Sequence, residues 1–369
     1  MRVALVVFVC FLALSGLANA QTGFRIQSIQ RNTNETITLT WPTLAGRTYH
    51  VMFADALDGL WQDIPDGQLT AGTNDSTLCY TDIFAIGASQ LFYRVRRDRP
   101  RLVMTLVLDR SGSMGAPPGQ GSGVGAALVP AVTVFINNFD DNTDRAAMVG
   151  FATTITVDVP MGHPFKTSIT AAVSNLVYTG GTFAQGGLTN ALVQNNSVVT
   201  APGENVLKVA VFFTDGMANI VQDTLNCGGA PTLRNFGGFD SGNFVGFFDP
   251  SMGLEFCDTS GGVPPCCPGV SGFTSAIDGS LKSFVRTNVT ADAEYRAIQV
   301  ANDMRTAGMY VYSIGLGIGV NMPFLQQVAN DPNSATFNPA QPAGLAVIAN
   351  SPADLQTVFD QIASQILAH

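Results

Sequence analysis

Charged side chains are scarce in this 369-residue sequence, where they make up 12% of all residues, against 46% for hydrophobic ones. That composition excludes a disordered chain, which would have few hydrophobic residues and a high net charge. The formal net charge of -9 disfavours a nucleic-acid partner, because such partners require a basic surface. Long apolar runs are missing too. The run at residues 3–14 is shorter than the roughly 20 residues that a membrane-spanning helix needs.

The usual residues of zinc sites and nucleotide sites are also lacking. The three histidines lie outside every motif discussed below, so we assign them no role. Cys266 and Cys267 are adjacent and no Cys-x-x-Cys pair is present, which argues against a zinc site. The Gly/Pro-rich stretch at residues 115–125 lacks the Gly-Lys-Ser/Thr ending of a phosphate-binding loop, so nucleotide binding is disfavoured.

The first 20 residues have the pattern of a secretory signal peptide. Arg2 precedes the short apolar run, and Ala18-Asn19-Ala20 has the small-residue pattern of a cleavage site. We expect the mature chain to begin at Gln21, to lack a transmembrane segment, and to be secreted, periplasmic or attached to the cell surface. Export permits disulfide bonds, and the five cysteines of the mature chain leave at least one without an intrachain partner.

Residues 21–98 lack helical periodicity and predict a small all-β sandwich. Hydrophobic and polar side chains alternate with the period of a strand in residues 36–41, 49–53 and 91–95. We expect Trp41 and Trp61, the only two tryptophans, to anchor the core of this module. It weakly resembles fibronectin type III or immunoglobulin-like modules. The domain boundary is expected near Asp98.

Residues 99–369 predict an α/β domain in which strands and helices alternate, as a doubly wound, mostly parallel sheet requires. We expect strands at residues 103–108, 145–151, 206–214 and 309–316. We expect helices at residues 124–138, 167–176, 184–195 and 291–307, and a last helix whose apolar face begins at Leu355.

A short polar motif follows the apolar strand at residues 103–108. Asp109, Ser111 and Ser113 are spaced by two, so they can direct three oxygens to one point beyond the carboxyl end of the strand. An oxygen-only set suits Mg²⁺, Mn²⁺ or Ca²⁺ better than zinc or copper. Taken alone, the motif is equally consistent with an Asx-type turn that closes a strand.

Two later residues complete a known pattern. Asp109, Ser111 and Ser113, then Thr182 in Thr-Gly-Gly-Thr and Asp215 in Phe-Phe-Thr-Asp-Gly, follow the order Asp-x-Ser-x-Ser, Thr, Asp. The chain therefore resembles a von Willebrand factor type A (vWA) domain, a Rossmann-like α/β fold, with its metal-ion-dependent adhesion site. The resemblance implies that these five residues bind one divalent cation, Mg²⁺ first among the candidates. It also implies that the cation coordinates an Asp or Glu carboxylate of a protein ligand, so the protein is an adhesion module and no enzyme.

Two other functions stay open. The metal could be structural in a pilus or surface-assembly component, or it could activate water in a hydrolase. The second is less favoured because the motifs contain no His, Lys or further carboxylate to act as a general base. Residues of about 217–289 form a long insertion that contains four cysteines. We expect this insertion to be a subdomain stabilised by at least one disulfide bond and to border the metal. The alternative is a family-specific addition without binding function.

Overall fold

The computed structural model describes residues 25–44, 46–72, 74–115, 124–201, 204–226, 231–240, 243–250, 255–258, 270–317 and 319–369. The chain divides into two compact units. One comprises residues 1–100 with 202–205, and the other comprises residues 101–201 with 206–369. The predicted signal peptide lies outside the described residues. Within those ranges, no helix combines the length and the apolar character needed to cross a bilayer.

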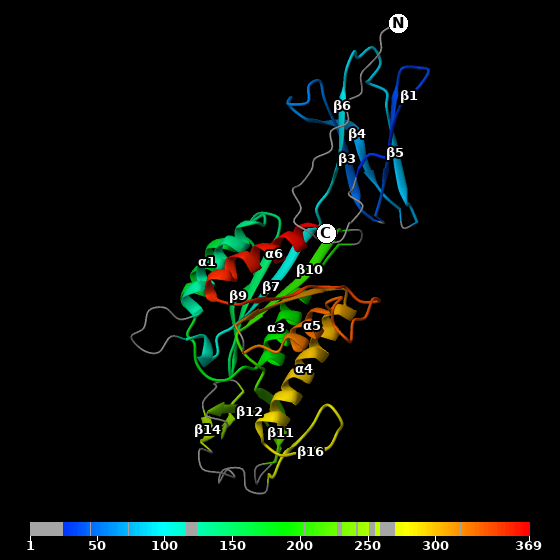
Figure 1. Ribbon diagram of the computed structural model, residues 1–369. Coiled ribbons are helices and arrows are strands. Elements are labelled where there is room, and N and C mark those ends of the chain that lie inside the picture. Colours follow the sequence, from blue (N-terminus) through cyan, green and yellow to red (C-terminus); the bar gives the residue numbers. More distant parts are fainter. Residues whose placement is uncertain are drawn as a thin grey trace. The chain divides into compact units, whose positions relative to one another are not determined.

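The N-terminal unit consists of two three-stranded antiparallel sheets (Figure 1). Its six strands are β1 (Ser28–Arg31), β2 (Ile37–Pro42), β3 (Thr48–Ala54), β4 (Gln62–Thr70), β5 (Thr77–Asp82) and β6 (Phe92–Arg97). They are ordered β1-β2-β5 and β4-β3-β6. The prediction of an all-β module is confirmed.

The core of this unit contains one of the two tryptophans. Trp41 is fully buried and packs with Tyr49, Leu39 and Val51. The expectation that Trp61 also anchors the core is wrong. Trp61 is only half-buried at the end of the β3–β4 loop, and the Arg94 guanidinium stacks 4.7 Å from its ring centroid. The Trp61 ring is therefore covered on one face by the Arg94 guanidinium, through a cation–π contact, and is not packed in the core between the sheets.

The second unit is built on a six-stranded sheet in the order β18-β17-β10-β7-β8-β9. Its strands are β7 (Arg101–Asp109), β8 (Arg145–Phe151), β9 (Ile155–Gly162), β10 (Val206–Thr214), β17 (Tyr310–Leu316) and β18 (Ala346–Ala349). All neighbouring pairs are parallel except β8 with β9. The predicted doubly wound, mostly parallel sheet is confirmed.

Helices cover both faces of this sheet (Figure 1). The helices are α1 (Val124–Asn137), α2 (Lys166–Ser174), α3 (Ala184–Asn196), α4 (Arg286–Thr306), α5 (Met322–Ala329) and α6 (Leu355–Leu367), with short 3-10 turns at Gly112–Met114 and Pro352–Asp354. Helices α1, α2 and α6 contribute to one hydrophobic cluster with the sheet, and α3, α4 and α5 contribute to the other.

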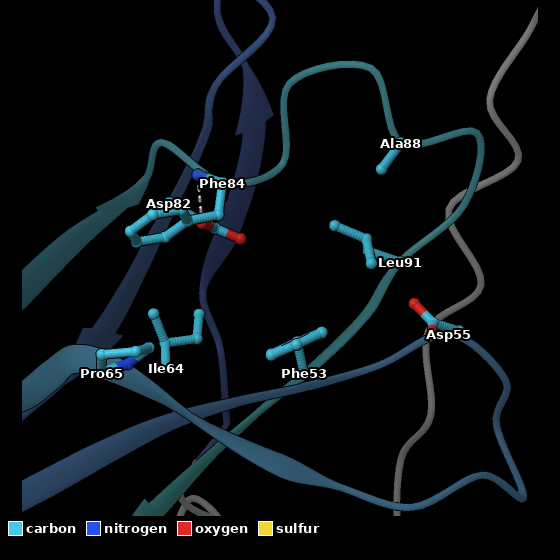
Figure 2. A pocket seen from close by; sticks show the side chains of 8 residues that line it. All are labelled: Phe53, Asp55, Ile64, Pro65, Asp82, Phe84, Ala88 and Leu91. Carbon is cyan, nitrogen blue, oxygen red and sulfur yellow. Dashed lines mark hydrogen bonds between the residues drawn. The ribbon is translucent and has the colours of Figure 1, made fainter.

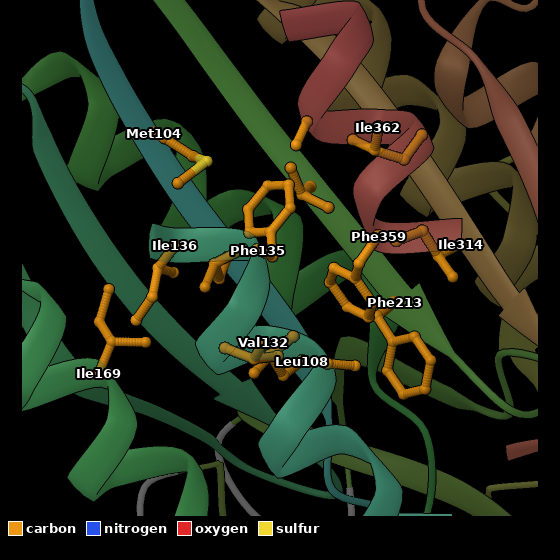
Figure 3. Packing of buried hydrophobic residues seen from close by; sticks show 14 of the residues in the cluster. Met104, Leu108, Val132, Phe135, Ile136, Ile169, Phe213, Ile314, Phe359 and Ile362 are labelled. Carbon is orange, nitrogen blue, oxygen red and sulfur yellow. The ribbon is translucent and has the colours of Figure 1, made fainter. Parts of the chain in front are cut away.

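Strand β7 lies at the centre because its side chains are apolar on both faces. Leu106 and Leu108 belong to the cluster under α1 and α6, and Val107 belongs to the opposite cluster. Figure 3 shows Phe135 of α1 and Phe359 of α6 over the first of these faces, with ring centroids 5.4 Å apart. A strand buried on both faces is typical of parallel sheets.

The insertion contains a second, antiparallel sheet. Its strands, in sheet order, are β11 (Ile220–Leu225), β12 (Thr232–Asp240), β13 (Asn243–Phe248) and β14 (Glu255–Asp258), and a hairpin of β15 (Phe273–Thr274) and β16 (Leu281–Lys282) follows. Its core is aromatic, since Phe236 and Phe284 lie with ring centroids 5.3 Å apart and both contact Phe273 and Phe247.

The predicted disulfide concerns cysteines whose side chains the structure does not describe. These are Cys227, Cys257, Cys266 and Cys267. The disulfide therefore stays a prediction. Cys79, on strand β5, is exposed and unpaired.

Candidate metal centre

The candidate site forms where two neighbouring strands end. Strands β7 and β10 are parallel and paired in register up to Leu108 and Phe213, so Asp109 and Thr214 end these strands side by side. Chain reversal after each strand then brings the Asp-x-Ser-x-Ser turn next to Asp215. Carboxyl ends of adjacent strands are where open α/β sheets place their ligands.

Asp109 is fully buried and accepts two hydrogen bonds. The backbone N–H of Ser111 donates to Oδ1 at 2.8 Å, and the Thr214 hydroxyl donates to Oδ2 at 2.5 Å. The first bond closes the Asx turn that the sequence allowed as an alternative. The turn and a metal site are compatible, because each carboxylate oxygen keeps a second lone pair.

Ser111, Ser113 and Asp215 form a continuous row of oxygen atoms. The two serine hydroxyl oxygens lie 3.0 Å apart, and the Ser113 hydroxyl donates to Asp215 Oδ1 at 2.7 Å. The structure therefore brings together four of the five predicted residues.

Thr182 lies on the adjoining loop, which backbone contacts hold against the motif. Gly112 N–H donates to the Gly180 carbonyl at 3.0 Å, and Thr179 N–H donates to the Arg110 carbonyl at 2.9 Å. Gly180 has a φ of +76°, and a Cβ there would meet Thr153 Oγ1 at 2.4 Å, so only glycine fits. Thr182 is buried, and its hydroxyl makes no hydrogen bond to the other four residues, all of which the structure describes.

Asn219, at the start of the insertion, fixes the backbone of Thr182. The Thr182 N–H donates to Asn219 Oδ1 at 2.7 Å, and the Asn219 N–H donates to the Thr182 carbonyl at 3.1 Å. A Cβ at Gly181 would approach Asn219 Oδ1 to 2.8 Å. The first residues of the insertion thus border the candidate site directly.

Both carboxyl groups resist ionisation in this arrangement. Burial, followed by the charge of Asp215, raises the pKa of Asp109 from its ordinary value to about 7, although its hydrogen bonds oppose the rise. Burial also raises the pKa of Asp215, against the hydrogen bond from Ser113. Within the described residues, no basic side chain forms an ion pair with either carboxyl group, although the charge of Arg110 interacts with that of Asp109. A buried and a half-buried acid that lie close together without an ion-pair partner are destabilised when both are ionised, so a bound cation would relieve their repulsion.

The donor set fits a hard divalent cation. Two carboxylates supply the charge, and hydroxyl oxygens of Ser111, Ser113 and Thr182 supply neutral ligands of the kind that Mg²⁺, Mn²⁺ and Ca²⁺ accept. Elsewhere in the described ranges, no group of three or more His, Cys, Asp or Glu side chains is arranged to hold a metal. The residues present therefore fit a cation at this edge of the sheet.

A sequence profile decides the family of this unit. The profile described as von Willebrand factor type A domain matches residues 104–226, which include all five candidate residues. The chain contains a vWA domain. No curated protein matches the chain.

Several solved structures are similar to the chain at low identity. Proximal thread matrix protein 1 from the mussel byssus is 15% identical, with a TM-score of 0.42, over 72% of this chain and 48% of that one. The chain thus spans about half the length of the mussel protein. Another structure of that protein is described as having a zinc-occupied metal-ion-dependent adhesion site.

Two pilus proteins are also similar. The PilB minor pilin from Streptococcus sanguinis is 16% identical, with a TM-score of 0.48, over 92% of this chain and 77% of that one. The von Willebrand factor domain of the type V pili tip protein Mfa5 from Porphyromonas gingivalis is 16% identical, with a TM-score of 0.44, over 73% and 95%.

Sequence reasoning missed two residues that position the candidate ligands of the vWA domain. Thr214 donates to Asp109, and Asn219 holds the Thr182 backbone. Thr214 carried a usable signal, because it is the last residue of a predicted strand beside Asp215. Asn219 carried none, because it lies in an insertion whose course the sequence leaves undefined.

Proposed function

We propose that the vWA domain binds one divalent cation through Asp109, Ser111, Ser113, Thr182 and Asp215, and that the protein is an exported adhesion module. Mg²⁺ is the first candidate, with Mn²⁺ or Ca²⁺ as substitutes. When bound, the cation supplies positive charge at which an external Asp or Glu carboxylate of a protein ligand can coordinate. The observation that carries the proposal is the fully buried carboxyl group of Asp109 and the half-buried one of Asp215 beside two serine hydroxyls, with no ion-pair partner for either acid among the described residues.

The residues of the chain divide this task between charge and orientation. Asp109 and Asp215 provide two negative charges, which balance the charge of a divalent cation without exceeding it. The cation can therefore still attract an anionic ligand from outside. The Ser111 N–H and the Thr214 hydroxyl fix the carboxylate of Asp109. Fixed ligands matter because a metal site loses affinity when the partners of its ligands are removed.

A binding role agrees with these side chains better than catalysis does. Hydrolysis at a bound cation also needs a general base or a second metal. The five candidate residues include neither His nor Lys, and both of their carboxylates are assigned to the cation. We therefore propose that the site binds and does not catalyse.

Calorimetry with Mg²⁺ on the parent, Asp109→Ala and Asp303→Asn tests the metal. Asp303 is an exposed acid near the end of α4, so its variant controls for a lost surface charge. We expect saturable binding by the parent and the control and none by Asp109→Ala. Equal binding by Asp109→Ala and the parent would refute the assignment.

Capture of proteins from the source's secretome, with Mg²⁺ against chelator, tests the ligand. Carbodiimide amidation of the captured proteins removes their carboxylates, and we expect it to abolish their rebinding. Capture of the same proteins in the presence of chelator would show that the ligand does not coordinate the cation. That result would favour the alternative, a structural metal in a pilus or surface-assembly component.

A further inference from the structure

A second candidate site lies in the N-terminal unit, at one end of its β-sandwich. There the β3–β4 loop, residues 55–61, and the β5–β6 loop, residues 83–91, flank a cavity of about 310 Å³. Phe53, Ile64, Phe84 and Leu91 supply much of its apolar wall. This volume lies at the lower end of the range of ligand pockets and suits one or two side chains.

The polar residues that line the cavity are both acids. Asp55 and Asp82 lie on opposite sides of it (Figure 2). Asp82 is 2% exposed, and it accepts hydrogen bonds from the Phe84 N–H at 2.8 Å and from the Tyr93 hydroxyl at 2.7 Å. No Lys, Arg or His forms an ion pair with either acid in the described part of the chain.

Exposed hydrophobic side chains are concentrated on the two loops that flank the cavity. Of the six large ones that the described N-terminal unit exposes, five lie on the two loops: Leu57, Leu60, Ile83, Phe84 and Ile86. Leu60 is 81% and Phe84 65% exposed. Such a concentration at one end of a small domain marks an interaction surface, whereas scattered exposed hydrophobics would need no explanation.

The charge of the two loops distinguishes a lipid partner from a protein partner. Neither loop contains Lys, Arg or His, and the first contains Asp55 and Asp58. The Arg94 guanidinium of β6 stacks on Trp61 at the end of the first loop, so one cation lies beside this otherwise acidic and apolar surface. Surfaces that insert into membranes pair apolar side chains with several basic ones, so this surface disfavours a lipid partner. Apolar walls between two carboxylates instead match a side chain with an apolar stem and a cationic end, as in lysine and arginine.

We propose that this cavity and its two loops bind a polypeptide segment of a partner protein in which lysine or arginine alternates with large apolar residues. The apolar side chains pack on Phe84 and Leu91, and the cationic group pairs with the carboxylate of Asp55. The site is independent of the metal centre, because all of its residues belong to the N-terminal unit.

Titration of the full chain with a capped peptide, acetyl-Leu-Lys-Phe-Lys-amide, tests the proposal. Trp61 lies at the end of the first loop and is half-buried, so its fluorescence reports binding there, with calorimetry as a second readout. We expect saturable binding that weakens with added salt. The glutamate peptide, acetyl-Leu-Glu-Phe-Glu-amide, should bind at least about fivefold more weakly, because it places like charges opposite Asp55.

Three variants localise the binding. Phe84→Ser should weaken the lysine peptide about tenfold or more, because it removes a large apolar contact. Asp55→Asn should weaken it about two- to fivefold, the range of an exposed ion pair. Leu44→Ser, a change at a 51% exposed leucine outside both loops, should have no effect. Melting curves confirm that each variant is folded.

Three results would overturn the proposal. One is equal binding of the two peptides, and another is unchanged binding by Phe84→Ser. The third is co-sedimentation of the chain with phosphatidylcholine vesicles that Phe84→Ser abolishes, since that would identify the surface as a membrane contact.

Discussion

Two buried aspartates, one in each unit, have nearly the same hydrogen bonds but different surroundings. Asp109 ends β7 and Asp82 ends β5. Each accepts the backbone N–H of the residue two positions later at 2.8 Å, and each accepts one hydroxyl, from Thr214 or from Tyr93. Next to Asp109 lie serine hydroxyls and a second acid, whereas next to Asp82 lie Phe53, Phe84 and Leu91.

The comparison shows that a buried carboxylate acquires its function from its neighbours. Oxygen atoms around Asp109 leave room for a small, hard cation that exchanges water for ligands. Apolar walls around Asp82 cannot replace the water of such a cation, so they suit a cation that carries its own apolar body. In the two proposals, an aspartate anchored in the same way therefore lies in two different kinds of site.

The same substitution at both aspartates should have opposite consequences, and this is the largest effect that we expect. Asp109→Ala should lower Mg²⁺ affinity by more than about 100-fold, because even removal of a partner of a ligand costs 10–100-fold. Asp109→Ala also deprives the Ser111 N–H and the Thr214 hydroxyl of their acceptor, which costs about 1–3 kcal/mol. At pH 8 the removal of a carboxylate whose raised pKa disfavours its ionised form offsets this cost, so metal-free stability should stay equal or rise slightly. Calorimetry and melting curves measure both quantities.

Asp82→Ala should instead destabilise the protein and leave Mg²⁺ binding unchanged. Its loss deprives the Tyr93 hydroxyl and the Phe84 N–H of their acceptor, which costs about 1–3 kcal/mol. Denaturant unfolding, followed by Trp41 and Trp61 fluorescence, measures this cost. A comparable loss of metal-free stability in both variants would break the comparison, because it would mean that the two carboxylates are equally tolerated.

The pH dependence of stability sharpens the contrast. In the unfolded chain Asp109 titrates near pH 4, whereas its pKa in the folded, metal-free protein is about 7. The unfolded state therefore releases its proton first, and the carboxyl group increasingly destabilises the fold as pH rises from about 4 to 7. Over that window, the melting temperature of dialysed parent should fall relative to Asp109→Asn.

Saturating Mg²⁺ should remove that difference at pH 8, because a ligand of the folded state stabilises the parent by mass action. Curves for parent and Asp109→Asn that stay parallel from pH 4 to 7 without metal would contradict the raised pKa.

Local sequence patterns predicted the elements that place the metal centre. The apolar run at residues 103–108 is part of β7, and β8 and β10 have the predicted bounds. Strand β9 was missed because it lies at the sheet edge, where only Val159 is buried and no clear pattern of burial results. Helix α4 begins at Arg286, before its predicted start at residue 291 and within the stretch predicted to be the insertion.

Contacts between distant segments could not be predicted in the same way. The aromatic core of the insertion, with Phe236 and Phe284, was not predicted. The disulfide expected from the cysteines of the insertion stays a prediction. The cavity beside Asp82 could not be predicted from the sequence. Its residues come from loops and strands of two sheets, and no helical or strand periodicity relates them. The candidate metal centre could be predicted because five residues follow a known order, whereas the cavity has no such sequence pattern.

Asn219→Ala should weaken Mg²⁺ binding about tenfold, the lower end for loss of a residue that positions a ligand. The change removes the acceptor of the Thr182 N–H and leaves the two proposed charged ligands in place. Asn142→Ala, at an exposed turn before β8, is the matched control and should bind Mg²⁺ as the parent does. An affinity equal to that of the parent would show that the insertion does not support the centre.

Thr182→Val should have the smallest effect, a loss of about two- to tenfold in Mg²⁺ affinity, as expected for one neutral oxygen. Valine keeps the shape of threonine, and the Thr182 backbone is held by Asn219 and Ile220 without help from the hydroxyl. The change therefore removes one oxygen and does not move the loop. Thr189→Val, at an exposed position on α3, controls for loss of a hydroxyl. If Thr182→Val binds Mg²⁺ with the affinity of Thr189→Val, the centre has four ligands from this chain, and Thr182 belongs to its surroundings.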